Sequence, residues 1–185
     1  CRTNRGCGDA EMNKQELLSV LQDLDREMSS PCDLVIVGGA AMILHFGANR
    51  ATQDVDVIIL RGAGKSFQDT VRRVADQHGL PPGWLSDAVK GFSDILPPDF
   101  YHRLVPLELP FQQLRAYVLG LPEQMAMKIV ALREQDLEDI ALLQPRLSES
   151  DRKVLLAIRD RLDGIRPDWA QKIRYFLQEQ GWKNV

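Results

Sequence analysis

The sequence predicts an α/β (α+β) fold, in which helices flank a small mixed β-sheet and the C-terminal part is helical. Two short apolar runs, at residues 33–37 and 52–60, are rich in β-branched side chains and are typical of strands. Elsewhere apolar residues recur at helical spacing, as Leu17, Leu21 and Leu24 do. The last third of the chain carries helical patterns alone, so we expect the helical part to follow the sheet.

The expected elements have recognisable ends. Ser29-Ser30-Pro31 ends the first helix, Gly47 and Gly79 follow the next two, and Pro122 lies in the first turn of the longest one. We expect helices at residues 13–28, 40–46, 66–78, 84–92, 122–143, 148–162 and 167–180. We expect strands at residues 33–37, 52–60, 103–109 and 114–119.

The length of the chain, 185 residues of which 44% are hydrophobic, is enough for one globular domain with a small helical appendage. We therefore expect a core at residues 12–145 and a C-terminal helical extension at residues 146–185. Residues 1–11 are glycine-rich and charged and have no apolar period. This composition predicts a disordered leader, with Met12 as the natural start.

Composition excludes several classes of protein. The formal net charge of -3 provides no overall basic field that would gather nucleic acid. Cys1, Cys7 and Cys32 are odd in number and irregularly spaced, which argues against a disulfide framework or a zinc site and favours a reducing, cytoplasmic setting. The longest apolar stretch, residues 35–46, is interrupted by Gly38-Gly39 and is too short to span a bilayer, so we expect no membrane partner.

Two aspartates at the start of the second strand are the first candidate site. Asp54 and Asp56 are two residues apart, so on a strand they project to the same side, about 6.5–7 Å apart. Two carboxylates this close repel each other, and a divalent cation relieves that conflict. Mg²⁺ is usually held by one or two carboxylates together with substrate phosphates, so the pair predicts a Mg²⁺ or Mn²⁺ site.

Gly38-Gly39, between the first strand and a short helix, is the second candidate site. Glycines let the backbone approach a phosphate closely, and the start of a helix offers free N–H groups. Sequential strands are usually neighbours, so this turn and the aspartates are expected side by side. Each feature alone is weak, because Gly-Gly is usually only a turn and paired aspartates can line a solvated edge.

Together these features resemble the signature of the DNA polymerase beta-like nucleotidyltransferase superfamily, a Gly-Gly or Gly-Ser turn followed by a strand with Asp-x-Asp. The forms Gly38-Gly-Ala-Ala and Arg50-x-Thr52-x-Asp54-x-Asp56 are similar to those of the minimal nucleotidyltransferases, including the abortive-infection toxin branch. The resemblance implies Mg²⁺-dependent transfer of a nucleoside monophosphate from a nucleoside triphosphate. It also implies that Arg50 and Thr52 bind the nucleotide with the glycines.

A second motif on the longest helix extends the resemblance. In the toxin branch a late helix often reads Lys-x-x-Ala-x-Arg-x-x-Asp-x-x-Asp-Ile, and residues 128–140 match it. On one continuous helix Lys128, Gln135 and Asp139 would form a single stripe, with Asp136 beside it. We expect Lys128 and Asp139 to act in catalysis, with Lys128 on the phosphates. One alternative is a solvated helical face with pairs such as Arg133 and Asp136, and another is a buried ion pair between Lys128 and Asp139.

Members of the superfamily usually supply a third metal-binding carboxylate from a later strand, and Glu108 is the candidate here, although prolines flank it. The leading hypothesis is thus a nucleotidyltransferase whose acceptor is tRNA, protein or a small molecule. The resemblance to the toxin branch implies that it is a toxin with a cognate antitoxin. The alternative is a catalytically degenerate module of the same fold that binds nucleotide or a partner protein.

Overall fold

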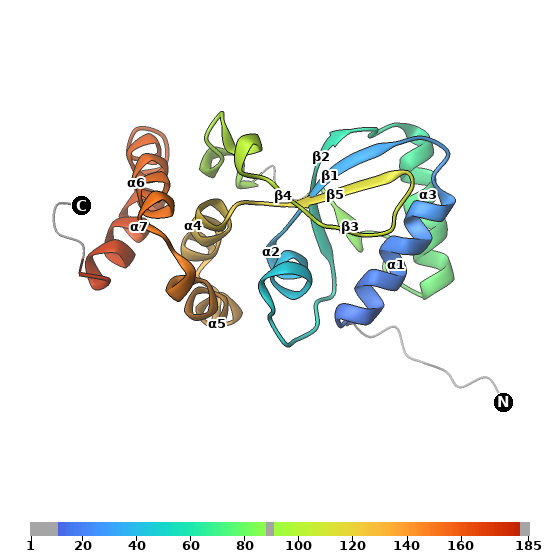
Figure 1. The fold of residues 1–185 in the computed structure, drawn as a ribbon, viewed down its shortest axis with the longest axis horizontal. Helices are drawn as coiled ribbons and strands as arrows, with labels where there is room; N and C mark the ends of the chain where they lie inside the picture. The colour runs from blue at the N-terminus through green and yellow to red at the C-terminus, as the bar shows by residue number, and fades with distance from the viewer. Residues whose placement is uncertain (1–10, 88–90, 182–185) are drawn as a thin grey trace.

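A five-stranded mixed sheet forms one end of the protein in the computed structural model, which describes residues 11–87 and 91–181 (Figure 1). The strand order is β3-β2-β1-β5-β4. The strands are β1 (Cys32–Val37), β2 (Val55–Arg61), β3 (Leu85–Ser86), β4 (Val105–Pro106) and β5 (Leu114–Val118). β1 runs antiparallel to β2 and parallel to β5, so the sheet is mixed, as the sequence predicts.

Two amphipathic helices, α1 (Lys14–Glu27) and α3 (Lys65–His78), pack on one face of this sheet. Side chains alternate along β1, so Leu34 and Ile36 join this apolar layer while Val35 and Val37 face the other way. The ends of both helices agree with the expected signals: a capping box at Asn13 begins α1, and Gly79, with φ 64°, ends α3.

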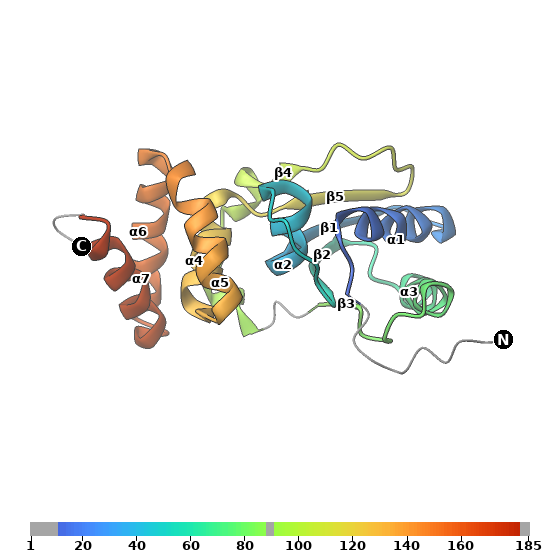
Figure 2. The ribbon, with the colours of Figure 1, turned by 90° about the horizontal axis from the view of Figure 1, so that it is seen from below.

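The other face meets the C-terminal helices, α4 (Leu121–Ala131), α5 (Glu134–Leu143), α6 (Glu149–Asp163) and α7 (Pro167–Glu179). In two perpendicular views α4 and α5 lie between the sheet and the α6–α7 pair (Figures 1 and 2). Val35 and Val37 share their apolar cluster with residues of all four helices. The sheet end and the helical end are therefore joined through α4 and α5.

Three expected elements differ in the structure, and one is the strand expected at residues 103–109, of which only Val105–Pro106 forms β4. The helix expected at residues 84–92 is wrong, because residues 85 and 86 form β3 beside β2; residues 88–90 lie outside the described residues. The long helix expected at residues 122–143 is broken in two at Leu132, which has φ 48°. That left-handed conformation ends α4, and Arg133 is the N-cap of α5.

The N-terminal predictions are tested only in part. Residues 1–10, with Cys1 and Cys7, lie outside the described residues. Met12, which directly follows the expected leader, is buried and pairs with Thr52 as an isolated antiparallel bridge. Cys32 is a buried free thiol, and burial raises its pKa to about 11. Within the described parts of the chain, no helix is long and apolar enough to cross a membrane.

Candidate nucleotide and metal site

The antiparallel pairing of β1 with β2 brings the glycine turn against the aspartates. Val37, the last residue of β1, is opposite Asp56 in the register. The next residue, Gly38, has φ +63°, and a Cβ atom placed on it would lie 3.2 Å from Oδ2 of Asp56. Both the backbone conformation and the close approach favour glycine here. The turn and the carboxylate thus form the two walls of one site.

Gly39 lies against the segment that leads into β2. A Cβ atom on Gly39 would lie 3.1 Å from Oγ1 of Thr52 and 3.5 Å from both terminal nitrogens of Arg50. Thr52 is held by its backbone bridge to Met12. Its hydroxyl donates to the carbonyl oxygen of Asp54 at 3.2 Å and lies 3.4 Å from the Asp54 carboxylate. Thr52 therefore fixes the loop that carries the first aspartate.

The two aspartates differ in environment. Asp54 is exposed and precedes β2, whereas Asp56 is half-buried in the strand and accepts a hydrogen bond from Ser86 Oγ at 3.1 Å. Burial, and then the charge of Asp54, raises the pKa of Asp56 above its usual value. The Ser86 hydrogen bond and the charges of Arg133 and Lys128 act in the opposite direction. Burial is thus the main reason that the ionised form of Asp56 is disfavoured, and repulsion from Asp54 adds to it.

This donor set fits a hard divalent cation. Asp54 and Asp56 supply carboxylate oxygens, and a cation between them would relieve the repulsion that helps to raise the Asp56 pKa. Gly38 leaves space beside Asp56 that any side chain would fill. A bound Mg²⁺ would be completed by substrate phosphate and water, since the described residues include no group of three or more His, Cys, Asp or Glu that could hold a metal.

Lys128 is the centre of a buried ion cluster beneath the site. Its ammonium group lies 2.7 Å from Asp136 Oδ1 and 2.7 Å from Asp139 Oδ2, and its side chain is 3% exposed. Asp139 Oδ2 also accepts from Arg50 Nη2 at 2.8 Å, and Asp136 Oδ2 accepts from Arg133 Nε at 3.0 Å. The cluster therefore connects α4 and α5 to Arg50, beside Gly39.

The break between α4 and α5 creates this geometry and corrects the helical-stripe expectation. On one straight helix Lys128, Gln135 and Asp139 would face the same way, but Gln135 is exposed while Asp136 and Asp139 fold back onto Lys128. The alternative of a buried ion pair between Lys128 and Asp139 thus describes the observed contact. Burial opposes ionisation of Asp136, but hydrogen bonds from Arg133 and Lys128 hold its pKa below the usual value.

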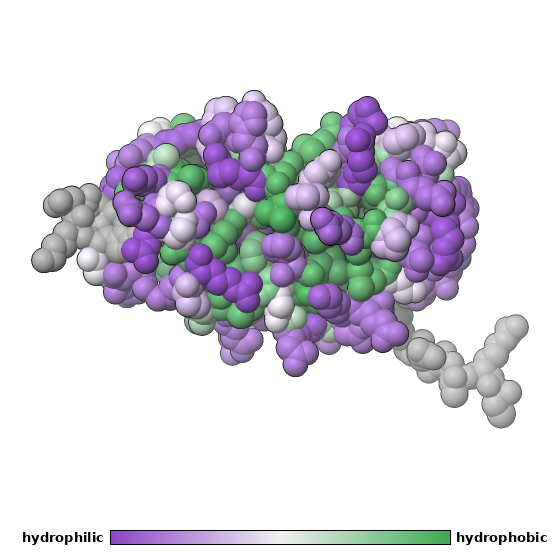
Figure 3. All heavy atoms as spheres, in the orientation of Figure 1, coloured by the Kyte–Doolittle hydropathy of each residue, from purple (hydrophilic) through white to green (hydrophobic). Residues whose placement is uncertain are grey.

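Glu108 is not brought to the aspartates. β4 contains only Val105–Pro106 and is the far edge of the sheet, separated from β2 by β5 and β1. Its antiparallel course carries Glu108 away from the end of β1, to a cavity of about 240 Å³ that Lys14 and His45 also line. On the face of the molecule seen in the orientation of Figure 1, apolar residues gather around the middle (Figure 3). The expectation of a third metal ligand at Glu108 therefore has no support from the geometry.

β3 supplies features that the sequence does not reveal. Ser86 is opposite Asp56 in the parallel register, and Asp87 follows it. Asp87 lines a cavity of about 320 Å³ together with Ile58, which is two residues beyond Asp56 on β2, and with Ser93, Leu96, Pro97, Pro98 and Phe100. The helix that the sequence predicts at residues 84–92 does not imply this contact, because Ser86 meets Asp56 only through the pairing of β3 with β2.

The glycine turn held against a strand-borne aspartate, in a small mixed sheet followed by helices, agrees with the resemblance to nucleotidyltransferases that the motifs carry. The family model described as "Nucleotidyltransferase of unknown function (DUF6036)" matches residues 15–149, and the chain belongs to this family. Among solved structures, an antigenic nucleotidyltransferase-like protein from Paracoccidioides brasiliensis is similar with a TM-score of 0.48 and 19% sequence identity, over 89% of this chain and 95% of that chain. A search of curated proteins found no match.

Proposed function

We propose that the protein is a Mg²⁺- or Mn²⁺-dependent nucleotidyltransferase that transfers a nucleoside monophosphate from a nucleoside triphosphate to an acceptor hydroxyl. The observation that carries this proposal is the contact of Gly38 with Asp56, because it joins the phosphate-binding turn and the metal-binding carboxylate in one site. Membership of a nucleotidyltransferase family supports it. The acceptor is a tRNA, a protein or a small molecule.

In this proposal each part of the site has a defined role. Asp54 and Asp56 hold the divalent ion, which when bound neutralises charge on the phosphates and orients the reacting oxygens. The backbone at Gly38 and Gly39 lies close to the triphosphate, since neither residue has a side chain to exclude it. Arg50 is positioned against Gly39 by its ion pair with Asp139, which places a cation beside the same turn.

The motif at residues 128–140 supports a finer proposal, that the protein is the toxin half of a toxin–antitoxin pair of the abortive-infection type. Such a toxin would arrest growth when expressed alone, and a cognate antitoxin would relieve the arrest. Asp56→Asn in the expressed protein should abolish the arrest. Arrest by this variant at the parent's level would contradict the toxin proposal, because the arrest would not depend on transfer.

The direct test is transfer of label. The protein is incubated with each α-labelled nucleoside triphosphate, Mg²⁺ or Mn²⁺, and total tRNA or cell extract, and macromolecular and small-molecule products are separated. We expect labelled product and release of pyrophosphate, both abolished by chelation and by Asp54→Asn or Asp56→Asn. Asp69→Asn is the matched control, because Asp69 lies on α3 at the opposite face of the sheet and is 44% exposed.

The second candidate function is a degenerate module that binds nucleotide or a partner protein without transfer. It is favoured by one observation, that the described residues place no third carboxylate with Asp54 and Asp56. Metal-dependent nucleotide binding with no labelled product from any of the four triphosphates would establish this alternative. Loss of that binding in Asp56→Asn would show that the same site is used.

A further inference from the structure

The ion cluster raises the question of which cation contacts the substrate. Three cationic side chains surround Asp136 and Asp139, and they differ sharply in exposure. The side chain of Lys128 is 3% exposed and that of Arg50 is 18% exposed, whereas that of Arg133 is 72% exposed. Lys128 is fully engaged by two carboxylates. Only Arg133 combines a place in the cluster with open access from solvent.

Arg133 is held by one part of its guanidinium group. Asp136 Oδ2 accepts both from Arg133 Nε and from the Arg133 backbone N–H, each at 3.0 Å. The other oxygen of Asp136 is fixed by Lys128 at 2.7 Å, so the carboxylate has little freedom to turn. Among the described residues, nothing accepts a hydrogen bond from Nη1 or Nη2 of Arg133. The two terminal nitrogens can therefore bind a planar or tetrahedral anion in a forked geometry.

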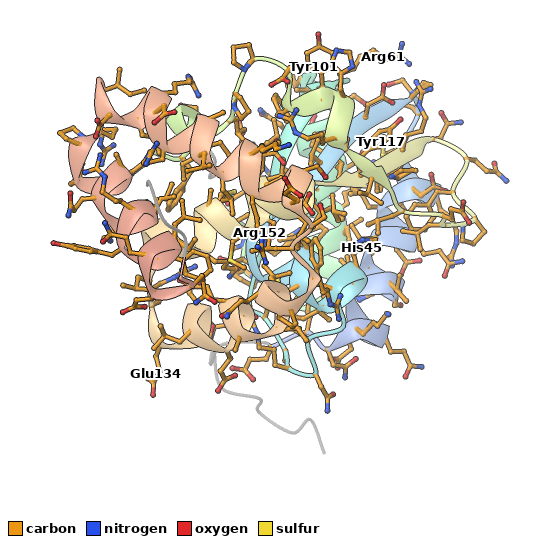
Figure 4. All side chains as sticks on the ribbon, turned by 60° about the vertical axis from the view of Figure 1, so that its left-hand side comes forward. His45, Arg61, Tyr101, Tyr117, Glu134 and Arg152 are labelled. Carbon is orange, nitrogen blue, oxygen red and sulfur yellow. The ribbon has the colours of Figure 1, made fainter. Side chains whose placement is uncertain are left out.

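The position of Arg133 relates it to the metal site. After the hydrogen bond to Asp136, the charges of Asp56 and Asp54 contribute to raising the Arg133 pKa, and Arg133 in turn opposes the upward shift at Asp56. The contacts of the cluster agree with this, because Asp136 connects Arg133 through Lys128 and Asp139 to Arg50, which lies beside Gly39. Figure 4 shows Glu134, the next residue, at the outer edge of the molecule, which agrees with a turn that is open to solvent.

The backbone between α4 and α5 adopts a left-handed conformation that helps to place Arg133. Leu132 has φ +48°, a conformation that costs a non-glycine residue free energy, and it is 49% exposed. This single residue reverses the chain between α4 and α5 and makes Arg133 the N-cap of α5. Asp136, one turn into α5, is thereby brought to both Arg133 and Lys128.

We propose that Arg133 contacts the triphosphate of the incoming nucleotide, and that Lys128 is a positioning residue that fixes Asp136 and through it Arg133. This inference rests on the proposed function, because it assigns a substrate contact in the same site. With a divalent ion held by Asp54 and Asp56, these carboxylates would compete less for the charge of Arg133. The terminal nitrogens of its guanidinium group would then be available to a phosphate. Phosphates of a nucleic-acid acceptor have the same chemistry, and the test separates the two sources.

The test measures binding by isothermal titration in Mg²⁺, with α,β-methylene analogues of the four nucleoside triphosphates, the matching nucleosides, and a single-stranded oligonucleotide. Arg133→Gln should weaken analogue binding by about 10- to 100-fold, as expected for the loss of charge-assisted hydrogen bonds. It should leave nucleoside and oligonucleotide binding and the melting temperature near the parent's values. Arg133→Lys should recover only part of the affinity, because it restores charge without the forked geometry.

The control is Arg72→Gln on α3. The Arg72 side chain is 69% exposed and, like that of Arg133, it pairs with an aspartate three residues away, Asp69. Analogue affinity in Arg133→Gln equal to that in Arg72→Gln would overturn the inference. In that case, loss of Mg²⁺-dependent analogue binding in Asp56→Asn would leave the proposed function intact and reject only the role of Arg133. Weakened oligonucleotide binding with unchanged analogue binding would also overturn it and assign Arg133 to the acceptor. A parent protein that binds no analogue would overturn both proposals.

Discussion

Lys128→Met separates a positioning role from direct catalysis. Methionine keeps most of the apolar stem of lysine and removes only the ammonium group. In the parent that group lies 2.7 Å from Asp136 and 2.7 Å from Asp139, and all three side chains are at most 3% exposed. Removing the central cation leaves two buried carboxylates with one charged partner each, Arg133 and Arg50.

The expected cost follows from this geometry. Breaking a buried ion pair by removing one partner typically costs about 3–5 kcal/mol. We expect the lower end, about 3 kcal/mol, because Arg133 and Arg50 continue to compensate the two carboxylates. In a chain of this length 1 kcal/mol corresponds to about 2–4 °C, so the melting temperature should fall by about 6–12 °C. Lys128→Met combined with Asp139→Asn should lose less than the sum of the single variants, since position 139 then carries no buried charge that lacks its lysine partner.

Urea denaturation followed by circular dichroism measures the free energy of unfolding, and label transfer is measured on the same samples. The control is Lys153→Met, whose side chain is 73% exposed and whose pair with Glu149 at 3.5 Å should contribute less than about 1 kcal/mol. Transfer in Lys128→Met should also fall, because Arg133 and Arg50 lose their fixed positions. A Lys128→Met variant as stable as Lys153→Met, with transfer nearly abolished, would refute the positioning role and assign Lys128 directly to the substrate.

Two further substitutions test the site and the fold. Asp56→Asn should raise the free energy of unfolding in metal-free buffer at pH 7, because burial and Asp54 raise the pKa of Asp56 in the folded state. Because the Asp56 pKa is raised on folding, the parent loses stability as pH rises from the unfolded-state pKa to the folded-state pKa. The stability gained by Asp56→Asn should therefore disappear below about pH 3.8. Equal gains at pH 7 and pH 3 would contradict this. Asp25→Ala removes a buried carboxylate that accepts from the backbone N–H groups of Gln112, Gln113 and Leu114, and should cost about 2–3 kcal/mol in urea denaturation. A loss no larger than that of Asp69→Ala would show that these bonds contribute little.

Much of the sheet and its first helices could be predicted from local signals. Asn13 and Gly79 have side-chain or backbone chemistry that sets a helix end regardless of distant contacts. The continuous apolar run of β1 likewise follows from burial on both faces of the sheet. β3 could not be predicted, because a strand of two residues has no periodicity and exists only through pairing with β2. The break at Leu132 has no sequence signal, since leucine is a strong helix former.

The site was predictable where its members are close in sequence. Gly38, Gly39, Asp54 and Asp56 follow from two strands that are neighbours, and the structure brings the turn and Asp56 within contact. The roles at residues 128–140 were not predictable from helical geometry, because the break changes which side chains meet. Arg133 occupies the arginine position of the motif at residues 128–140, but the sequence assigns it no role, since an i,i+3 pair with an aspartate is also common on solvated helices.

The buried cluster is better understood as a device for geometry than as a source of stability. Buried ion pairs often contribute no more than apolar residues of similar volume, so stability alone gives little reason to place three charges under the site. What the cluster does uniquely is to fix two cations from opposite sides. Asp139 holds Arg50 against Gly39, and Asp136 holds Arg133 at the open turn. Lys128 connects the two carboxylates, so a single buried ammonium group sets the positions of both guanidinium groups relative to the glycine turn.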